Sequence, residues 1–151
     1  MKEKTFVPPI KIQGIKTKLV PLIRQNILMN KEAVWIEPFM GSGVVGFNME
    51  PSHAIFADTN PHIIEFYRQI KQGRITPSIV KSFLAREGKL LEEGDDKHYY
   101  AVRNRFNESH DPLDFLFLNR SCFNGMIRFN KDNEFNVPYG HKPLRFSKGN
   151  L

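Results

Sequence analysis

A glycine-rich turn and a later acidic residue are the features of this sequence best suited to chemistry. The turn, Glu37-Pro-Phe-Met-Gly-Ser-Gly43, follows one apolar segment, and Asp58 follows the next. Glycines let the backbone approach a ligand closely, and free N–H groups at a helix start face electron-rich groups. A carboxylate after the next strand can accept hydrogen bonds from ribose hydroxyls. The pattern predicts a pocket for an adenosine-bearing cofactor; the alternative is a tight turn with Asp58 as a helix cap.

The spacing of the glycines excludes some cofactor classes but leaves others open. The turn lacks the GxGxxG spacing that is typical of nicotinamide binding, and it lacks the GxxxxGK[ST] pattern of a nucleotide-triphosphate P-loop. Ligands of open α/β sheets sit at the carboxyl ends of the strands, where both the turn and Asp58 are expected. The pattern alone does not choose among the remaining adenosine-bearing cofactors.

The apolar periodicity around the turn predicts a parallel α/β unit. Short apolar runs predict strands over 33–37 and 54–57, and helical spacing predicts a helix over 18–28 and a further helix starting at 44. Asn60 and Pro61 are typical of a helix start, and that helix is expected to run to about Lys71. Strand, turn, helix, strand and helix in this order are characteristic of parallel α/β folds.

The rest of the chain predicts helices and then a hairpin. Amphipathic spacing predicts helices over 77–91, 95–107 and 112–122, with no strand between 73 and 119. A polar turn at 130–134, followed by a returning apolar segment, predicts a β-hairpin.

Charge and composition point to a polyanionic partner and away from metals and membranes. The net charge is +6, and from Asn119 onward basic residues outnumber acidic ones and alternate with aromatics. Such a stretch can bind phosphates and stack on bases, or it can be a well-packed, solvated hairpin. The lone Cys122, with no CxxC or HExxH pattern, predicts no metal site. No apolar run is long enough to cross a bilayer, so a cytoplasmic protein without a membrane partner is expected.

Several segments, taken in order, resemble the motifs of Dam-type (alpha-arrangement) adenine-N6 DNA methyltransferases. They are Lys11-Ile-Gln-Gly14-Ile-Lys16, Glu37–Gly43, Phe56-Ala-Asp58-Thr-Asn60, Phe117–Asn130 and Phe135–Gly140. The resemblance implies a partial Rossmann-like, S-adenosyl-L-methionine-dependent methyltransferase sheet, followed by a helical target-recognition region with a β-hairpin. It divides the chain into a cofactor-binding part, a DNA-recognition region with the hairpin near 123–140, and a tail: 1–75, 76–145 and 146–151.

The resemblance also implies roles for individual residues at the cofactor. Lys16 would contact the carboxylate end of the methionine moiety, Asp58 would hold the ribose, and Ile12 falls where relatives often have an aromatic residue. Lys16 could instead be an ordinary lysine at a helix start. The full set expected to bind S-adenosyl-L-methionine is Ile12, Gly14, Lys16, Glu37, Pro38, Phe39, Gly41, Ser42, Gly43, Asp58 and Asn60. Lys16, the Gly41/Gly43 turn and Asp58 are expected to converge on one ligand.

For double-stranded DNA, the resemblance implies contacts from the hairpin. Arg128 would read a base edge, because arginine commonly pairs with guanine in two hydrogen bonds. Arg120 would contact a phosphate, or it would close a structural salt bridge. Phe129 could be buried in the core, and Cys122 is expected to be a packed residue. The full set expected at DNA is Arg120, Phe123, Asn124, Met126, Arg128, Asn130, Asn136 and Pro138.

The tetrapeptide that grips the target adenine in this family is missing from the sequence. The family uses Asp/Asn-Pro-Pro-aromatic, whereas Val7-Pro-Pro-Ile10 lacks the polar first residue and the aromatic last one. We therefore expect that this chain alone does not methylate DNA. It would be part of a longer enzyme, or one subunit of a split enzyme whose second polypeptide carries the tetrapeptide.

Other functions remain open at this stage. The chain could be a non-catalytic or degenerate fragment, or a specificity subunit, that binds DNA, cofactor or both. It could also belong to a methyltransferase for another substrate such as RNA, although the hairpin motifs disfavour this reading. The sequence does not decide whether the methylation would serve restriction–modification.

Overall fold

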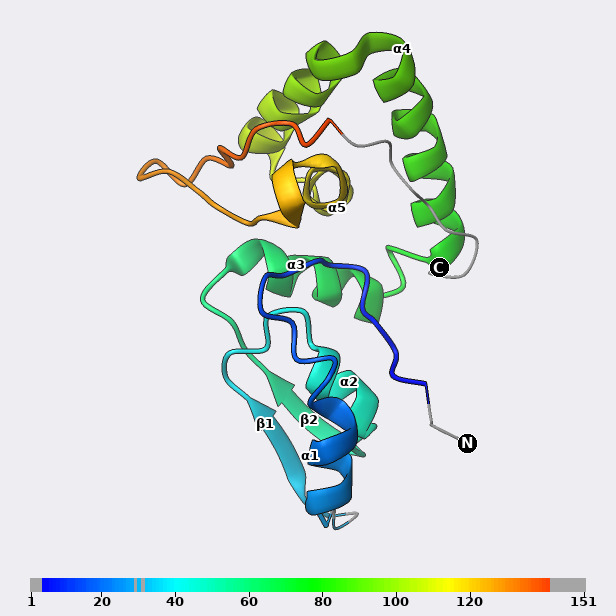
Figure 1. Ribbon diagram of the computed structural model, residues 1–151, viewed down its shortest axis with the longest axis vertical. Helices are drawn as coiled ribbons and strands as arrows, with labels where there is room; N and C mark the ends of the chain where they lie inside the picture. The colour runs from blue at the N-terminus through cyan, green and yellow to red at the C-terminus, as the bar shows by residue number, and fades with distance from the viewer. Residues whose placement is uncertain (1–3, 29, 31, 142–151) are drawn as a thin grey trace.

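The computed structural model describes residues 4–28, 30 and 32–141. The expected tail over 146–151 and the end of the region assigned to 76–145 lie outside these residues. The first half contains the predicted order of helices and strands: α1 (Val20–Asn26), β1 (Val34–Glu37), α2 (Val44–Met49), β2 (His53–Phe56) and α3 (Pro61–Lys71). Figure 1 shows these elements below α4 and α5, with α3 between the two halves.

The two strands form a small parallel sheet. Val34 lies opposite His53, and Glu37 lies opposite Phe56. The described residues therefore form an α/β unit with a two-stranded parallel sheet, which is consistent with the partial sheet that the resemblance implies. One face of the sheet is covered by α2, where the rings of Phe47 and Phe56 lie 5.2 Å apart.

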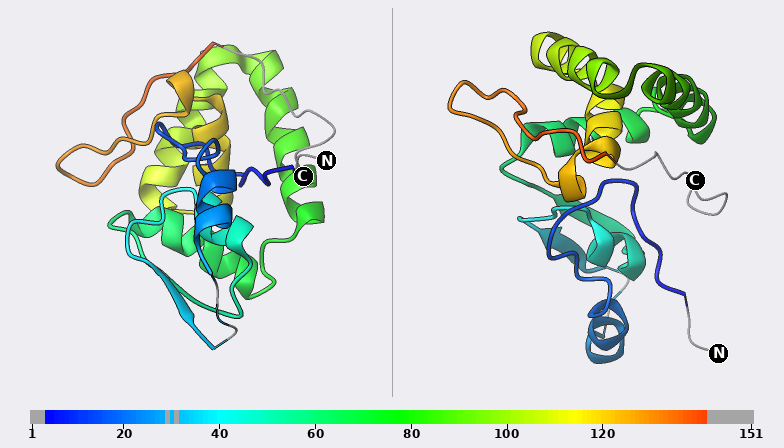
Figure 2. Two further views of the ribbon diagram at one scale, coloured as in Figure 1. Left: turned by 60° about the horizontal axis from the view of Figure 1, so that its bottom comes forward. Right: turned by 45° about the horizontal axis from the view of Figure 1, so that its top comes forward.

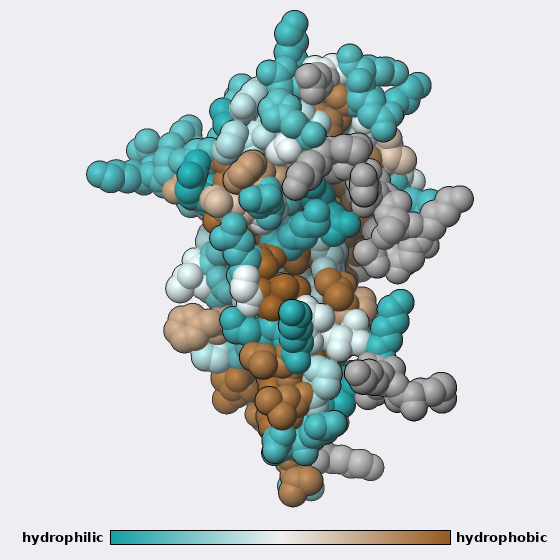
Figure 3. Space-filling view, viewed as in Figure 1, coloured by the Kyte–Doolittle hydropathy of each residue, from teal (hydrophilic) through white to brown (hydrophobic). Residues whose placement is uncertain are grey.

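The other face of the sheet is left exposed by the residues that the structure describes. Side chains two residues apart on a strand share a face, so Val34 and Ile36 lie on one side, together with Ile55, the partner of Ile36. Val34, Ile36 and Ile55 are 51%, 63% and 56% exposed. We call these three residues the open sheet face. Figure 3 shows hydrophobic side chains gathered over the part of the molecule that holds α1 and the sheet.

A single long helix replaces the two helices that the sequence predicts over 77–91 and 95–107. Helix α4 (Pro77–Ser109) continues through Gly94 and curves over α5. It continues because apolar residues at helical spacing are buried on both sides of Gly94, among them Leu84, Leu91, Tyr99 and Val102. A gain from packing of this kind outweighs the cost of about 1 kcal/mol for one glycine inside a helix.

Helix α5 (Pro112–Ser121) runs through the centre of the core. Asp111 caps it by accepting hydrogen bonds from Leu113 N and Asp114 N. The four residues of 115–118 are buried on all sides of the helix, as expected for a helix that is enclosed by others. The core cluster joins α5 with α3, α4 and the apolar segment over 135–139. This core therefore includes residues from both sides of position 75, where the sequence places the boundary between the cofactor-binding part and the DNA-recognition region.

The segment that follows α5 is an irregular antiparallel ribbon, which we call the 122–140 ribbon. It begins with the short helix η1 (Phe123–Gly125), and its two sides meet in isolated bridges, Cys122 with Tyr139 and Phe129 with Phe135. The predicted hairpin is thus present, but as separate bridges. One reason is that Asn124, at φ 55°, departs from extended backbone. Figure 2 shows the ribbon projecting from the helices.

Two expected absences concern membranes and metals. None of the helices within the described ranges is both long and apolar enough to span a bilayer. Across the same residues, His, Cys, Asp and Glu side chains do not gather in groups of three or more that could hold a metal ion.

Candidate functional site

The loops after β1 and β2 meet at Gly41 and Asp58. Gly41 N donates a hydrogen bond to Asp58 Oδ2 at 2.8 Å, and Asn60 N donates to Asp58 Oδ1 at 2.9 Å. Gly41 has φ 52°, a left-handed conformation that favours glycine. The side chain that caps α3 is Asn60, whose Oδ1 accepts from His62 N, so Asp58 is not the cap of this helix.

A cavity of about 270 Å³ opens beside this pair. Its walls come from three parts of the chain: the segment before α1, the loops after the strands with the start of α3, and the 122–140 ribbon. Four of the residues predicted to bind the cofactor line it together with one predicted DNA residue and three others, namely Ile12, Gly41, Asp58, Asn60, Met126, Gln13, Ile63 and Ile127. We call this cavity the Asp58 pocket.

Other residues of the predicted cofactor set brace the turn from behind. Glu37 Oε2 accepts hydrogen bonds from Gly46 N at 3.0 Å and from Trp35 Nε1 at 3.2 Å. Ser42 is buried, and its carbonyl accepts from the Tyr67 hydroxyl at 2.7 Å. These contacts fix the course of the glycine-rich turn between β1 and α2.

The remaining residues of the turn differ in their exposure. Gly43 has φ 72° and precedes the first residue of α2, where its amide donates to Met40 O. Pro38 and Phe39 face solvent, and Phe39 is 80% exposed. An aromatic ring so exposed beside a pocket is available to a ligand or to another protein surface.

Lys16 and Gly14 lie at the end of the segment that holds Ile12. Lys16 Nζ donates to Gly14 O at 2.8 Å, and the side chain is exposed. Of the residues expected to converge, Gly41 and Asp58 line the pocket together with Ile12, whereas Gly43 is not among the lining residues and the Lys16 ammonium group is turned toward its own loop.

Asn119 fastens this segment to the ribbon, a role that sequence reasoning missed. Its amide Oδ1 accepts from Lys11 N at 2.8 Å, and its Nδ2 donates to Lys11 O at 2.9 Å and to Gly125 O at 3.3 Å. Asn119 is fully buried. A polar amide inside the apolar run of α5 was the available signal, because buried amides are retained where their hydrogen bonds are satisfied.

The predicted DNA residues lie along the 122–140 ribbon. Phe123 and Asn124 are exposed, and Phe123 N donates to Pro138 O at 2.9 Å across the ribbon. Pro138 is exposed as well, whereas Met126 is half-buried in the wall of the Asp58 pocket.

Arg128 and Asn130 are held by neighbours in the ribbon. Arg128 Nε donates to Asn136 Oδ1 at 2.7 Å, and Arg128 Nη2 donates to Asn136 O at 3.0 Å. Asn130 Oδ1 accepts from Glu134 N at 2.8 Å and closes the turn. These bonds orient the exposed guanidinium of Arg128 without burying it.

Arg120 differs from the other predicted DNA residues because it points inward. Its Nη1 donates to Pro9 O at 3.3 Å, and burial lowers the pKa of Arg120. Among the described residues the partner of Arg120 is this backbone carbonyl and not a carboxylate, so the alternative of a structural salt bridge is not seen, and the phosphate contact stays a prediction. Cys122 is the packed residue that the sequence predicts, and burial raises the pKa of its thiol to about 11.

His62 joins the pocket region to the ribbon and was not singled out from the sequence. Its ring stacks on that of Phe129 with centroids 4.8 Å apart and planes at 20°. Phe129 is half-buried against the core, as the alternative reading of this residue expected. His62 is itself buried, and its Nε2 has no hydrogen-bond partner among the residues that the structure describes. Burial and, secondarily, the nearby His110 lower the pKa of His62 to about 4.

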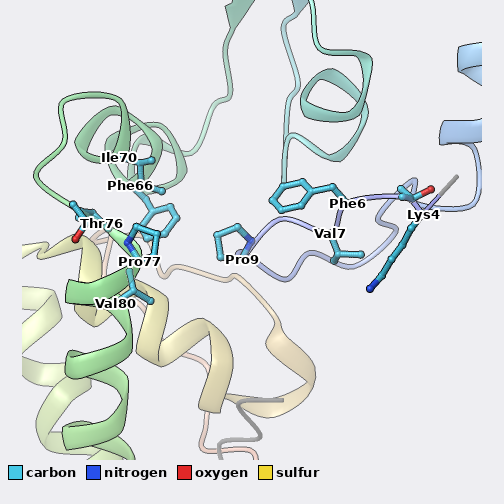
Figure 4. A pocket seen from close by; sticks show the side chains of 11 residues that line it. Lys4, Phe6, Val7, Pro9, Phe66, Ile70, Thr76, Pro77 and Val80 are labelled. Atoms are coloured by element: carbon cyan, nitrogen blue, oxygen red, sulfur yellow. The ribbon is translucent and has the colours of Figure 1, made fainter. Parts of the chain in front are cut away.

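A larger cavity of about 620 Å³ lies elsewhere, between the N-terminal arm and the junction of α3 with α4. Figure 4 shows Phe6, Val7 and Pro9 of the arm on one side, with Phe66 and Val80 on the other. Among the described residues of its lining, Lys4 is the only charged one. This cavity lacks the loop and carboxylate features of the Asp58 pocket.

Comparison with known proteins identifies a family over most of the chain. The model of the D12 class N6 adenine-specific DNA methyltransferases matches residues 13–151. A DNA adenine methylase from Haemophilus influenzae is 37% identical over 141 residues, covering 88% of this chain and 46% of that protein. The type II methyltransferase M.MjaIII from Methanocaldococcus jannaschii is 32% identical over 164 residues, covering 95% of this chain and 56% of that protein.

The relatives include a further bacterial enzyme. A DNA adenine methylase from Escherichia coli (strain K12) is 37% identical over 135 residues, covering 87% of this chain and 46% of that protein. The chain spans about half the length of these curated relatives.

Proposed function

The chain belongs to the family of D12 class N6 adenine-specific DNA methyltransferases, and we propose that it supplies the part of such an enzyme that binds S-adenosyl-L-methionine and duplex DNA. The observation that carries this proposal is the Asp58 pocket, where the glycine-rich turn and Asp58 meet at the carboxyl ends of two parallel strands. This is the position that ligands of open α/β sheets occupy.

The chemistry of the pocket fits an adenosyl cofactor. Each Asp58 oxygen accepts one backbone hydrogen bond, so each retains a lone pair for a ribose hydroxyl. Ile12 and Ile63 supply apolar walls for an adenine ring, and Lys16 is close enough in sequence to Ile12 to serve the methionine carboxylate by leaving Gly14. When bound, S-adenosyl-L-methionine would supply an activated methyl group on its sulfonium.

Duplex DNA is the proposed partner of the 122–140 ribbon. Its exposed face combines Phe123, Asn124 and Pro138 with the guanidinium of Arg128. Arg128 is held by Asn136 in a fixed orientation, which favours paired hydrogen bonds to a base edge. Asn130, Asn136 and Arg120 would serve the DNA backbone, although Arg120 would have to leave Pro9 first.

We propose that methyl transfer to a flipped adenine requires a second polypeptide, or the remainder of a longer chain, that carries the Asp/Asn-Pro-Pro-aromatic tetrapeptide. The exocyclic amine of adenine is a poor nucleophile, because its lone pair is delocalised into the ring. It needs the hydrogen-bond acceptors that the tetrapeptide supplies, and this sequence lacks that tetrapeptide. The open sheet face supports such a partner, because exposed contiguous apolar side chains favour association. This chain alone is then inactive.

A second candidate function is a non-catalytic DNA- and cofactor-binding fragment or specificity subunit. The absent tetrapeptide favours it. Under either function, residues 1–75 would bind the cofactor and residues 76–145 would bind the DNA. Action on DNA and a free, buried Cys122 support a cytoplasmic location.

Calorimetric titration of the 151-residue chain with S-adenosyl-L-methionine tests the proposal. Wild-type protein should bind, and Asp58→Asn should bind at least about tenfold more weakly, equivalent to about 1.4 kcal/mol. Asp96→Asn, an exposed change on α4, is the matched control and should leave the affinity unchanged. Absence of binding by the folded wild-type chain would contradict the proposed function.

A further inference from the structure

The Asp58 pocket is built from both functional halves of the chain. Gly41, Asp58 and Asn60 come from the loops after the strands, whereas Met126 and Ile127 come from the 122–140 ribbon. Any ligand that fills the pocket therefore touches the segment that carries Arg128. The proposed cofactor site and the proposed DNA-binding ribbon therefore share one wall of the pocket.

A second connection runs through His62. Asp58 accepts a hydrogen bond from Asn60 N, and Asn60 Oδ1 accepts one from His62 N. The His62 ring then stacks on Phe129, which follows Arg128 directly in the ribbon. A continuous series of contacts thus leads from the carboxylate in the pocket to the proposed base-reading arginine.

His62 stacks on Phe129 although burying its unpaired Nε2 is unfavourable in free energy. Burying a polar atom without a hydrogen bond destabilises the fold, so such atoms in folded proteins call for an explanation. His62 Nε2 is buried among Phe106, His110, Phe115 and Phe129. An aliphatic residue would fill the same space without that cost but would not stack on Phe129.

We propose that His62 is a positioning residue that joins the Asp58 pocket to the 122–140 ribbon, so that filling the pocket and binding duplex DNA favour each other. The inference rests on the proposed function and goes beyond it, since two sites can exist in one chain without affecting each other. A ligand that orders Met126 and Ile127 lowers the conformational entropy that DNA must remove from the ribbon. By linkage, DNA then raises the affinity for the ligand by the same factor.

The test measures this factor with two probes. S-adenosylhomocysteine fills the pocket without donating a methyl group, and a fluorescent duplex of mixed sequence reports DNA binding by anisotropy. The dissociation constant of the duplex is determined with and without saturating S-adenosylhomocysteine for the 151-residue chain. We expect the ligand to tighten DNA binding of the wild type by about fivefold or more.

Three variants separate positioning from folding. His62→Leu should at least halve the factor while changing each separate affinity by less than about twofold, because it removes the ring that stacks on Phe129 but leaves the pocket lining and the DNA surface in place. His62→Phe should restore the factor, since it retains an aromatic partner for Phe129. Phe83→Leu, which removes an aromatic ring from α4 away from the pocket lining, should leave the factor unchanged.

The outcomes distinguish the inference from the proposed function. If both probes bind wild type independently, or if His62→Leu retains the full factor, the inference is overturned and the proposed function stands. If the folded wild type binds neither probe, both are overturned. If His62→Leu does not fold, Phe129→Leu is measured instead, and retention of the full factor by that variant overturns the inference equally.

Discussion

Lys11 and Asn119 form a reciprocal hydrogen-bonded pair although 108 positions separate them in the sequence. The Lys11 amide donates to the Asn119 side chain, and the same side chain donates back to the Lys11 carbonyl. The pair closes the segment that carries Ile12 and Lys16 onto the end of α5. The position of one pocket wall therefore depends on a residue of the helical half of the chain.

Replacing Asn119 by leucine tests this dependence. Asn119→Leu keeps the branched shape of the side chain but removes three hydrogen bonds and leaves the backbone N–H and C=O of Lys11 without this partner. We expect the free energy of unfolding to fall by about 1–3 kcal/mol and the affinity for S-adenosylhomocysteine to fall with it. Urea unfolding and calorimetry measure the two effects.

The control for this change is Asn104→Leu, an exposed position on α4. It should alter the free energy of unfolding by less than about 0.5 kcal/mol. Equal stability of the Asn119 and Asn104 variants would show that the pair does not hold the segment.

The pH dependence of stability should reveal His62. The pKa of His62 is lowered to about 4 in the fold, whereas an unfolded histidine has its ordinary value of about 6.5. Between these values the unfolded state binds more protons, so stability is full above pH 6.5 and is lost progressively as the pH falls toward 4. The shift of about 2.5 pKa units corresponds to a loss of up to about 3 kcal/mol.

His62→Phe isolates this contribution, because phenylalanine does not titrate. The difference in unfolding free energy between wild type and variant should widen, in favour of the variant, as the pH falls from 6.5 to 4. It is measured by urea unfolding across this range. If the two proteins lose stability in parallel as the pH falls, the pKa of His62 is not lowered by folding.

The sequence was sufficient for features that depend on neighbouring residues. Asn60 before Pro61 predicts the start of α3, and the glycine-rich turn predicts the tight connection between β1 and α2. These features are local, because capping and turn chemistry act over a few residues.

Features that depend on distant partners could not be predicted in this way. The hydrogen bond of Arg120 to Pro9 O, at the other end of the chain, could not be expected from the residues around Arg120. The continuity of α4 through Gly94 depends on packing against α5 and the ribbon. His62 reads as an ordinary residue at a helix start, and its stack with Phe129 exists only in the folded chain.

Arg128 and Lys131 should contribute differently to DNA binding. Arg128→Ala should reduce discrimination between duplexes that differ at one guanine by about 1–3 kcal/mol, because a bidentate base contact is lost. Lys131→Ala, an exposed change at the ribbon turn, should weaken all duplexes alike and lower the salt slope by about one. Competition anisotropy at several salt concentrations separates the two. Equal effects of both variants on every sequence would argue against base reading by Arg128.

The open sheet face should be required for activity with a catalytic partner. Ile36 is 63% exposed and lies beside Val34 and Ile55, so Ile36→Asp leaves the fold largely intact but places a charge where an apolar surface would dock. The chain is mixed with the catalytic portion of a D12 relative that carries the tetrapeptide, and methyl transfer to duplex DNA is measured. We expect activity from the wild-type mixture and at least about tenfold less from Ile36→Asp, since a buried unpaired charge costs several kcal/mol.

The matched control introduces the same charge at another exposed apolar residue. Ile79→Asp lies in the first turn of α4, outside the open sheet face, and should retain activity because Ile79 is 42% exposed and is not part of that face. Circular dichroism and thermal unfolding check that both variants fold. Full activity of Ile36→Asp in the mixture would show that the partner docks elsewhere, and methyl transfer by the 151-residue chain alone would show that no partner is needed.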